Sequence, residues 1–194
     1  MQKELTIAGR WLLVCRAVAA LRLAIALGLS VLTGCGSGLK FKPLRINAEP
    51  EEYRSTSRTQ ESAVQIEKVP GGLRCVVVSN GDPAKTHSGG VVLPAKGAKG
   101  FRLDLKFVDP DGIVIVSVDA CSSRNQTVAR WQTEHWAKLP RNKTTYIFIP
   151  QKGTKDFKPV ASTGSGGIET IHVFVAVQRG HGAIFELSNI ELAK

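Results

Sequence analysis

The stretch that defines the fold of this chain reads Phe101-Arg-Leu-Asp-Leu-Lys-Phe-Val108, Asp109-Pro-Asp-Gly112, Ile113-Val-Ile-Val116. Its first part alternates apolar and polar residues, which is the pattern of a strand with one buried face. In its middle part, Pro suits the second position of a type I turn and Gly112 tolerates a positive φ. Its last part is apolar throughout, as in a strand buried on both faces. The stretch therefore predicts two strands joined by a tight turn.

Short runs of this kind recur along the chain, and helical periodicity is almost absent after residue 43. Gly, Pro, Asn and Asp separate the runs, as expected for turns. The expected strands are 63–69, 73–79, 90–93, 101–108, 113–119, 127–133, 144–149, 168–178 and 183–192. Many short strands with regular turns predict an all-β, antiparallel β-sandwich. The stretch 151–167 has no strand signal, and we expect a loop there that is functional, mobile or a crossing between sheets.

The N-terminal segment has the three parts of an export signal. A basic region ends at Arg22, an uncharged run covers 23–32, and Leu32-Thr-Gly-Cys35 follows. The apolar run is too short for a membrane-spanning helix of about 20 residues, but it suits a signal peptide. A membrane anchor starting at Leu12 would instead place Arg16 and Arg22 in the bilayer, at about 2.5–3.5 kcal/mol each.

The segment Leu32–Cys35 resembles the lipobox of bacterial lipoproteins. The resemblance implies that the signal helix, 1–34, is removed and that Cys35 carries diacylglycerol and an added acyl chain such as palmitate. More than one chain is needed for stable anchoring. The residue after the cysteine is Gly36. An Asp at this position would disfavour transfer to the outer membrane, whereas Gly36 is compatible with it. We therefore expect a cell-envelope protein, in the outer membrane rather than the inner, with a lipidated tether at 35–43 and a sandwich domain at 44–194.

The positive charge of the chain limits its partners. The whole chain carries +10, and removal of Lys3, Arg10, Arg16, Arg22 and Glu4 with the signal lowers this to +7. Such a charge favours phospholipid headgroups, lipopolysaccharide or acidic polysaccharides. Nucleic acid is not expected, because of the location and because no strand alternates basic and aromatic residues.

Four motifs follow one another in the second half of the chain. They are Val114-Ile-Val-Ser-Val118, Leu139-Pro-Arg-Asn-Lys-Thr-Thr-Tyr-Ile-Phe-Ile-Pro150, Ile168-Glu-Thr-Ile-His-Val-Phe-Val-Ala-Val177 and Phe185-Glu-Leu-Ser-Asn-Ile-Glu-Leu192. This order resembles the galactose-binding-like jelly roll of non-catalytic carbohydrate-binding modules, and Ile46-Asn-Ala-Glu49 resembles the opening of one such family. The resemblance implies a jelly-roll sandwich that binds sugars without cleaving them.

The same resemblance bears on whether the chain has a structural calcium site. In such modules an acidic pair before the last strand can help to hold a structural Ca²⁺, but this chain has Ser188-Asn189 there. Glu49 and the Asn189 carbonyl are the remaining oxygen candidates. The loss of the carboxylates disfavours the site, and we expect no other cofactor besides the lipid on Cys35.

A sugar-binding site needs flat apolar faces with polar groups at the rim. The two tryptophans after the signal lie close together, and the ligand-binding candidates are Arg130, Trp131, Glu134, His135, Trp136 and Tyr146. If both tryptophans project from one strand end, they form a stacking platform. The alternative, favoured for Trp131, is that it is a core residue, as large aromatics in sandwich strands usually are.

Two cysteines, Cys75 and Cys121, remain after the signal is removed and Cys35 is lipidated. An oxidising compartment allows a disulfide between them, and two buried free thiols are the alternative.

No catalytic motif is evident. The chain has no Gly-x-Ser-x-Gly elbow, no phosphate-binding loop and no zinc-ligand spacing, so we expect no enzyme activity. The favoured hypothesis is a lipid-anchored sandwich that binds an extracytoplasmic polysaccharide. The alternative is an assembly lipoprotein that docks on another envelope protein, which predicts a contiguous exposed apolar patch.

Overall fold

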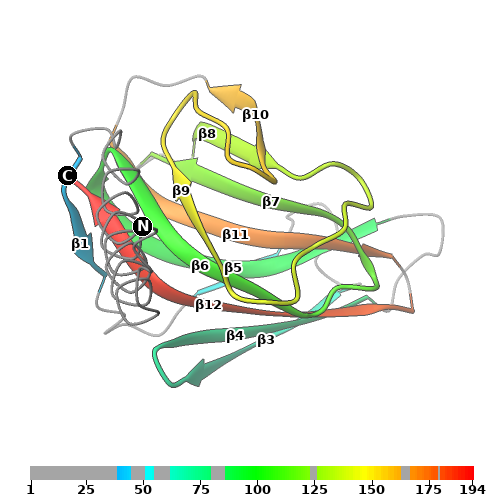
Figure 1. The fold of residues 1–194 in the computed structure, drawn as a ribbon. Helices are drawn as coiled ribbons and strands as arrows, with labels where there is room; N and C mark the ends of the chain where they lie inside the picture. Colours follow the sequence, from blue (N-terminus) through cyan, green and yellow to red (C-terminus); the bar gives the residue numbers. More distant parts are fainter. Residues whose placement is uncertain are drawn as a thin grey trace, which may run out of the picture. The chain divides into compact units, whose positions relative to one another are not determined.

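A computed structural model describes residues 39–44, 51–54, 62–79, 86–122, 126–162, 167–178 and 180–194. These residues form two antiparallel β-sheets stacked face to face (Figure 1). None of them belongs to a helix long and apolar enough to cross a bilayer. The expected signal helix at 1–34 and Cys35 lie outside the described residues.

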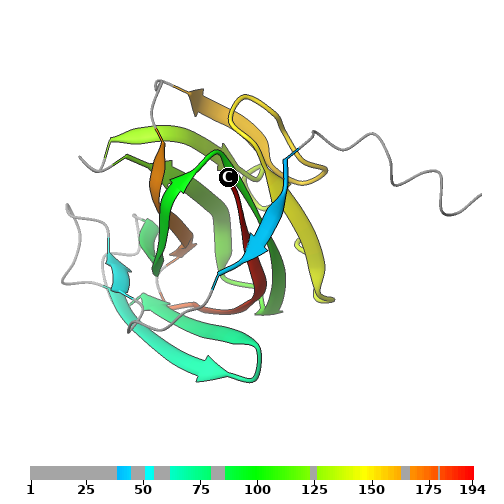
Figure 2. The same cartoon turned by 90° about the vertical axis from the view of Figure 1, so that its left-hand side faces the viewer.

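The first sheet, sheet A, runs in the order β3-β4-β12-β6-β9, with β1 paired to the end of β12. Its strands are β1 (Phe41–Pro43), β3 (Ser62–Val69), β4 (Gly72–Ser79), β6 (Gly100–Asp109), β9 (Thr144–Phe148) and β12 (Gly182–Ala193). The second sheet, sheet B, runs in the order β10-β8-β7-β11-β5-β2. Its strands are β2 (Glu51–Arg54), β5 (Thr86–Ala98), β7 (Ile113–Cys121), β8 (Thr127–Gln132), β10 (Lys158–Ser162) and β11 (Ile168–Gln178). Figure 2 shows the sheets on opposite sides of the core, with β9 in one and β11 in the other.

The predicted all-β, jelly-roll-type sandwich is confirmed, and each of the nine expected segments forms a strand. The sequence underestimated β5, which begins at Thr86 rather than at Gly90. It also missed β10, which lies inside the stretch 151–167 that we expected to be a loop. β10 is a short edge strand with a register shift after Pro159, and such a strand carries little alternation.

The sandwich begins inside the stretch that we expected to be a tether. Phe41 pairs with Ala193 of β12, and the amide of Leu44 donates to the carbonyl of Ile190 at 2.8 Å. The guanidinium of Arg102 lies 5.3 Å from the centre of the Phe41 ring, within the range of a cation–π contact. Residues 41–44 are therefore part of the folded domain.

Alternate positions of the strands supply the core. In β6, Phe101, Leu103, Leu105 and Phe107 are all fully buried between the sheets. Burial of such a side chain contributes about 1.5–3 kcal/mol. A group of aromatic rings lies at one end of this core, made of Phe101, Trp131, Tyr146, Phe148 and Phe157. The opposite side chains of each strand are left for the two outer faces of the sandwich.

Candidate functional site: the outer face of sheet B

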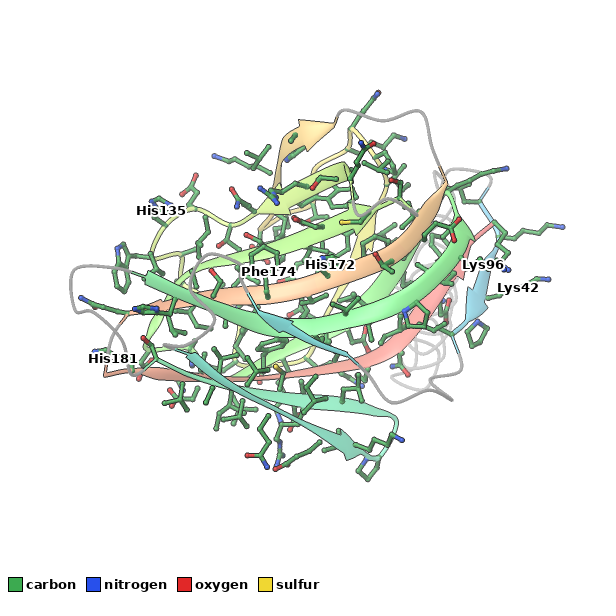
Figure 3. The ribbon with its side chains drawn as sticks, turned by 180° about the vertical axis from the view of Figure 1, so that it is seen from behind. Lys42, Lys96, His135, His172, Phe174 and His181 are labelled. Atoms are coloured by element: carbon green, nitrogen blue, oxygen red, sulfur yellow. The ribbon has the colours of Figure 1, made fainter. Side chains whose placement is uncertain are left out.

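The outer face of sheet B carries the polar side chains of its central strands (Figure 3). The inward positions of β7 and β11 hold core valines such as Val118 and Val173. Because successive side chains of a strand point to opposite faces, the residues that alternate with the core valines on each strand point outward. The outer face comprises Ser117, Asp119 and Cys121 on β7, Arg130 and Gln132 on β8, and His172 and Phe174 on β11.

Strand register arranges these residues in two rows across the sheet. Arg130 pairs with Asp119, and Asp119 with His172, so the three lie side by side on adjacent strands. The next row contains Gln132, Ser117 and Phe174 in the same order. Residues distant in sequence therefore meet on one rigid surface, which is the arrangement that a preformed binding site needs.

A two-point ion pair dominates the first row. Arg130 donates from Nε to Asp119 Oδ1 at 2.8 Å and from Nη2 to Asp119 Oδ2 at 2.5 Å. Only 3% of the Asp119 side chain is exposed, whereas 36% of the Arg130 side chain is. The fork geometry fixes the guanidinium plane, and about one-third of the Arg130 side chain remains exposed on this face.

Single, longer hydrogen bonds hold the remaining polar groups. Gln132 donates from Nε2 to Ser117 Oγ at 2.9 Å. His172 places Nε2 3.1 Å from Thr170 Oγ1 and Nδ1 3.9 Å from Cys121 Sγ. Burial, followed by the charge of Asp119, raises the pKa of the Cys121 thiol. Cys121 is therefore held protonated, which makes it a poor nucleophile.

Phe174 adds apolar surface to the second row, and 8% of it is exposed. Gly90 of β5 pairs with it and also with Tyr53 of β2. A Cβ on Gly90 would lie 2.1 Å from the carbonyl oxygen of Val173 and 2.6 Å from Cβ of Phe174. Only glycine allows the two strands to approach so closely beside the aromatic ring.

The structure divides the predicted ligand residues between the core, the outer face and a loop. Trp131, a candidate for a stacking platform or for the core, is fully buried, with its ring centroid 5.2 Å from that of Phe148. Its Nε1 donates to the carbonyl of Lys152 at 2.7 Å. The core alternative for Trp131 is confirmed, because its position in β8 is an inward one, and Trp131 is not available as a ligand-binding residue.

Tyr146 is also a core residue, only 3% exposed. Its hydroxyl donates to Asp156 Oδ2 at 2.7 Å. Burial and this carboxylate together raise the pKa of Tyr146. The expectation that Tyr146 contributes to a ligand surface was therefore wrong.

Glu134, His135 and Trp136 lie beyond the end of β8 and are all exposed. Glu134 accepts from Lys158 Nζ at 2.6 Å, and this bond lowers the pKa of Glu134. Of the six candidates, only Arg130 lies on the outer face of sheet B. The sequence prediction missed Asp119, His172 and Phe174, although polar positions in the apolar run of β7 were a usable signal.

Cys75 and Cys121 are both buried, and neither forms a disulfide. Cys75 belongs to the core cluster on sheet A, where it pairs with Ile66 and Phe185. Cys121 lies on the outer face of sheet B. The disulfide alternative is therefore wrong, because the two side chains belong to different sheets and point to different faces.

Of the two candidate calcium ligands, only Asn189 lies within the described residues. Asn189 donates from Nδ2 to Asp104 Oδ2 at 2.7 Å, so its amide is used as a donor. Asp104 also accepts from Thr145 and has the Lys143 ammonium at 3.7 Å, which disfavours a further cation. Glu49 lies outside the described residues. Within the described ranges, no group of three His, Cys, Asp or Glu side chains is placed to hold a metal ion.

Comparison with known proteins supports the fold. No protein-family model matches the sequence, and the search of curated proteins finds no match. Among solved structures, the chain is similar to the family 11 carbohydrate-binding module of a cellulosomal cellulase of Clostridium thermocellum, with 16% identity, a TM-score of 0.50, and coverage of 80% of this chain and 95% of that module. A structure of a family 11 module from the same organism, in complex with a β-1,3-1,4-mixed-linked tetrasaccharide, gives 15% identity, a TM-score of 0.51, and coverage of 80% and 96%. The sandwich described above is thus the fold of these modules.

Proposed function

We propose that the chain is a lipid-anchored cell-envelope protein whose sandwich binds an extracytoplasmic polysaccharide, without catalysis, on the outer face of sheet B. The observation that carries the proposal is the Arg130–Asp119 ion pair, which is held by two hydrogen bonds. Asp119 lies at the centre of a row that continues to His172. The pair lies on the outer face of the sheet, where Arg130 is partly exposed but the Asp119 carboxylate is almost fully buried.

The chemistry of this face suits sugar hydroxyls. Each hydroxyl can donate and accept, so it is bound well by neighbouring donors and acceptors on a rigid support. Arg130 and Gln132 carry N–H groups, His172 lies in the same row as Arg130, and Phe174 adds apolar surface beside them for the C–H face of a sugar ring. Because these side chains stand on paired strands, little conformational freedom is lost on binding.

Asp119 has no free oxygen for acid–base work. Both of its carboxylate oxygens accept from Arg130, whereas glycoside hydrolysis needs two carboxyl groups placed on either side of the scissile bond. The fold-level likeness to a module that was solved with a bound tetrasaccharide supports binding as an analogy.

Affinity electrophoresis of the full chain in detergent tests the binding proposal. The gels contain neutral β-glucans, including the mixed-linked β-1,3-1,4 type, or acidic polyuronates. We expect at least one polysaccharide to retard the protein, Arg130→Lys to weaken retardation at least tenfold, and the control Arg102→Lys on sheet A to leave it unchanged. Arg130→Lys keeps the charge but loses the fork geometry. Equal retardation of both variants would refute the proposed site.

The lipid anchor rests on Leu32–Cys35 and is tested separately. Cells that express the protein are labelled with radioactive palmitate and then fractionated. We expect label in the membrane-bound protein and neither label nor membrane retention in Cys35→Ser. An unlabelled wild-type chain would remove lipid anchoring from the proposal without affecting glycan binding.

A second candidate function, docking on another envelope protein, is favoured by an apolar strip on the outer face of sheet A. Val76 and Val78 of β4, Ile184 of β12 and Val108 of β6 occupy neighbouring outward positions, and Val78 and Val108 are more than one-third exposed. A photo-crosslinker at position 78 should then capture one specific protein, whereas the same group at position 102 should not.

A further inference from the structure

A pocket of about 640 Å³ lies at the end of the sandwich where β6 turns into β7. Its walls come from three connections that are distant in sequence. The residues that matter for its chemistry are Asp111, Trp136, Lys138, Arg141, Lys155 and Asp156. The volume is within the range of small-molecule sites.

Trp136 forms an exposed aromatic wall of this pocket. Its side chain is 58% exposed, which is the largest fraction among the exposed large hydrophobic residues of the described chain. Its φ of 57° lies in the left-handed region, which is rare for a bulky residue. The amide of Trp136 donates to Val114 O at 2.7 Å, and that of Ala137 to Glu134 O at 3.3 Å. These bonds hold an unfavourable backbone that presents an indole to solvent, and such strain suggests a functional role.

The pocket that Trp136 lines also carries three basic side chains and two carboxylates. Of the two carboxylates, Asp111 accepts from Arg141 at 2.7 Å and Asp156 accepts from the Tyr146 hydroxyl. In the part of the chain that the structure describes, no ion pair holds Lys138 or Lys155. The pocket therefore combines an exposed indole face with two ammonium groups that have no acidic partner among the described residues.

We infer that this pocket is a second binding site, separate from the outer face of sheet B, for a sugar ring that carries an anionic group. The C–H face of a pyranose ring stacks on the Trp136 indole, and Lys138 and Lys155 attract the anion. Uronic acids and sugar phosphates share this chemistry, so the experiment includes both.

Isothermal titration of the full chain in detergent provides the test. The probes are a hexuronate oligosaccharide, its carboxyl-reduced neutral form, and a hexose phosphate. We expect an anionic probe to bind at least tenfold more tightly than the neutral form, and Trp136→Ala to remove this binding. The double variant Lys138→Gln/Lys155→Gln should remove the preference for the anion. The control Lys99→Gln, at the far end of β6, should change nothing, and Arg130→Lys should leave this site intact.

The pattern of results identifies the anion or overturns the inference. Tight binding of either the hexuronate or the phosphate, lost in Trp136→Ala, supports the site and names its ligand class. Equal affinity for the neutral form, affinity unchanged in Trp136→Ala, or no binding of either anionic probe would overturn it. The indole N–H signal of Trp136, assigned from Trp136→Phe, should shift on binding, and unchanged thermal unfolding of each variant shows that a loss is local.

Discussion

The outer faces of the two sheets are built from the same alternating strand positions, but they hold their charges in different ways. On sheet A, Arg74 and Lys106 flank Glu186 in a cross-strand group in which about two-fifths of each basic side chain is exposed. On sheet B, Arg130 holds a carboxylate, that of Asp119, which is 3% exposed. Exposed pairs of the first kind stabilise a protein by at most about 1 kcal/mol. A buried carboxylate costs desolvation, so its retention points to a role other than stability.

The largest difference is expected when the arginine of each face is removed. Arg130→Ala leaves the buried Asp119 carboxylate without its charge partner and should lower the free energy of unfolding by about 2–3 kcal/mol. Arg102→Ala, which removes a pair with the more exposed Glu191, should cost less than about 1 kcal/mol. Urea unfolding of both variants measures the difference. Equal losses would mean that the two faces are electrostatically alike.

Removal of an apolar side chain should give the next largest difference. Phe174→Ala should lower the free energy of unfolding by about 2 kcal/mol, because the ring is mostly covered, and should also weaken polysaccharide binding. Val78→Ala on sheet A should cost less than about 0.5 kcal/mol and leave binding unchanged. If Phe174→Ala is destabilised but binds normally, the ring belongs to packing alone.

At alkaline pH, the two outer faces should contribute differently to the pH dependence of the free energy of unfolding. Burial raises the pKa of Cys121, so its stabilising contribution is complete below the ordinary thiol pKa of about 8.5 and is lost as the pH rises through the raised value. Tyr146 titrates in the same direction, so the measurement uses Tyr146→Phe as the background. In that background, Cys121→Ala should flatten the decline in the free energy of unfolding above about pH 9. An unchanged slope would show that the thiol does not titrate there.

The smallest effect is expected at Glu186 on sheet A. Its hydrogen bond with Arg74 lowers the pKa of Glu186, so its contribution is present above the ordinary pKa of about 4.3 and is lost as the pH falls through the lowered value. Glu186→Gln should cost less than about 1 kcal/mol at pH 7, and the loss should shrink in 1 M salt. A larger cost that does not change with salt would mean that Glu186 behaves like the buried Asp119 of sheet B.

The sequence predicted the strands better than their arrangement. Alternation in β6 and the apolar run of β7 depend on local burial, so both could be recognised without a structure. The separation of Cys75 from Cys121 depends on which sheet each strand joins, and no local pattern records that. β10 was missed because Pro159 and a register shift interrupt its pattern.

The candidate site was harder to predict than the fold. Trp131 and Trp136 are five positions apart, but β8 ends between them, so one faces the core and the other is exposed in a loop. The row from Arg130 to His172 joins strands that are paired only after folding. Ser117 and Asp119 were the available local signal, because two polar residues alternate with core valines in β7.

The most direct test of the account is to map the bound saccharide onto the two faces by amide NMR. The full chain in detergent micelles is titrated with the oligosaccharide of the polysaccharide that retards it most. The account predicts that the largest shifts fall on outward residues of β7, β8 and β11, including Asp119, Arg130 and His172, with little change in β4, β6 and β12. Shifts confined to sheet A, or no shift at Asp119 and Arg130 at saturation, would contradict it.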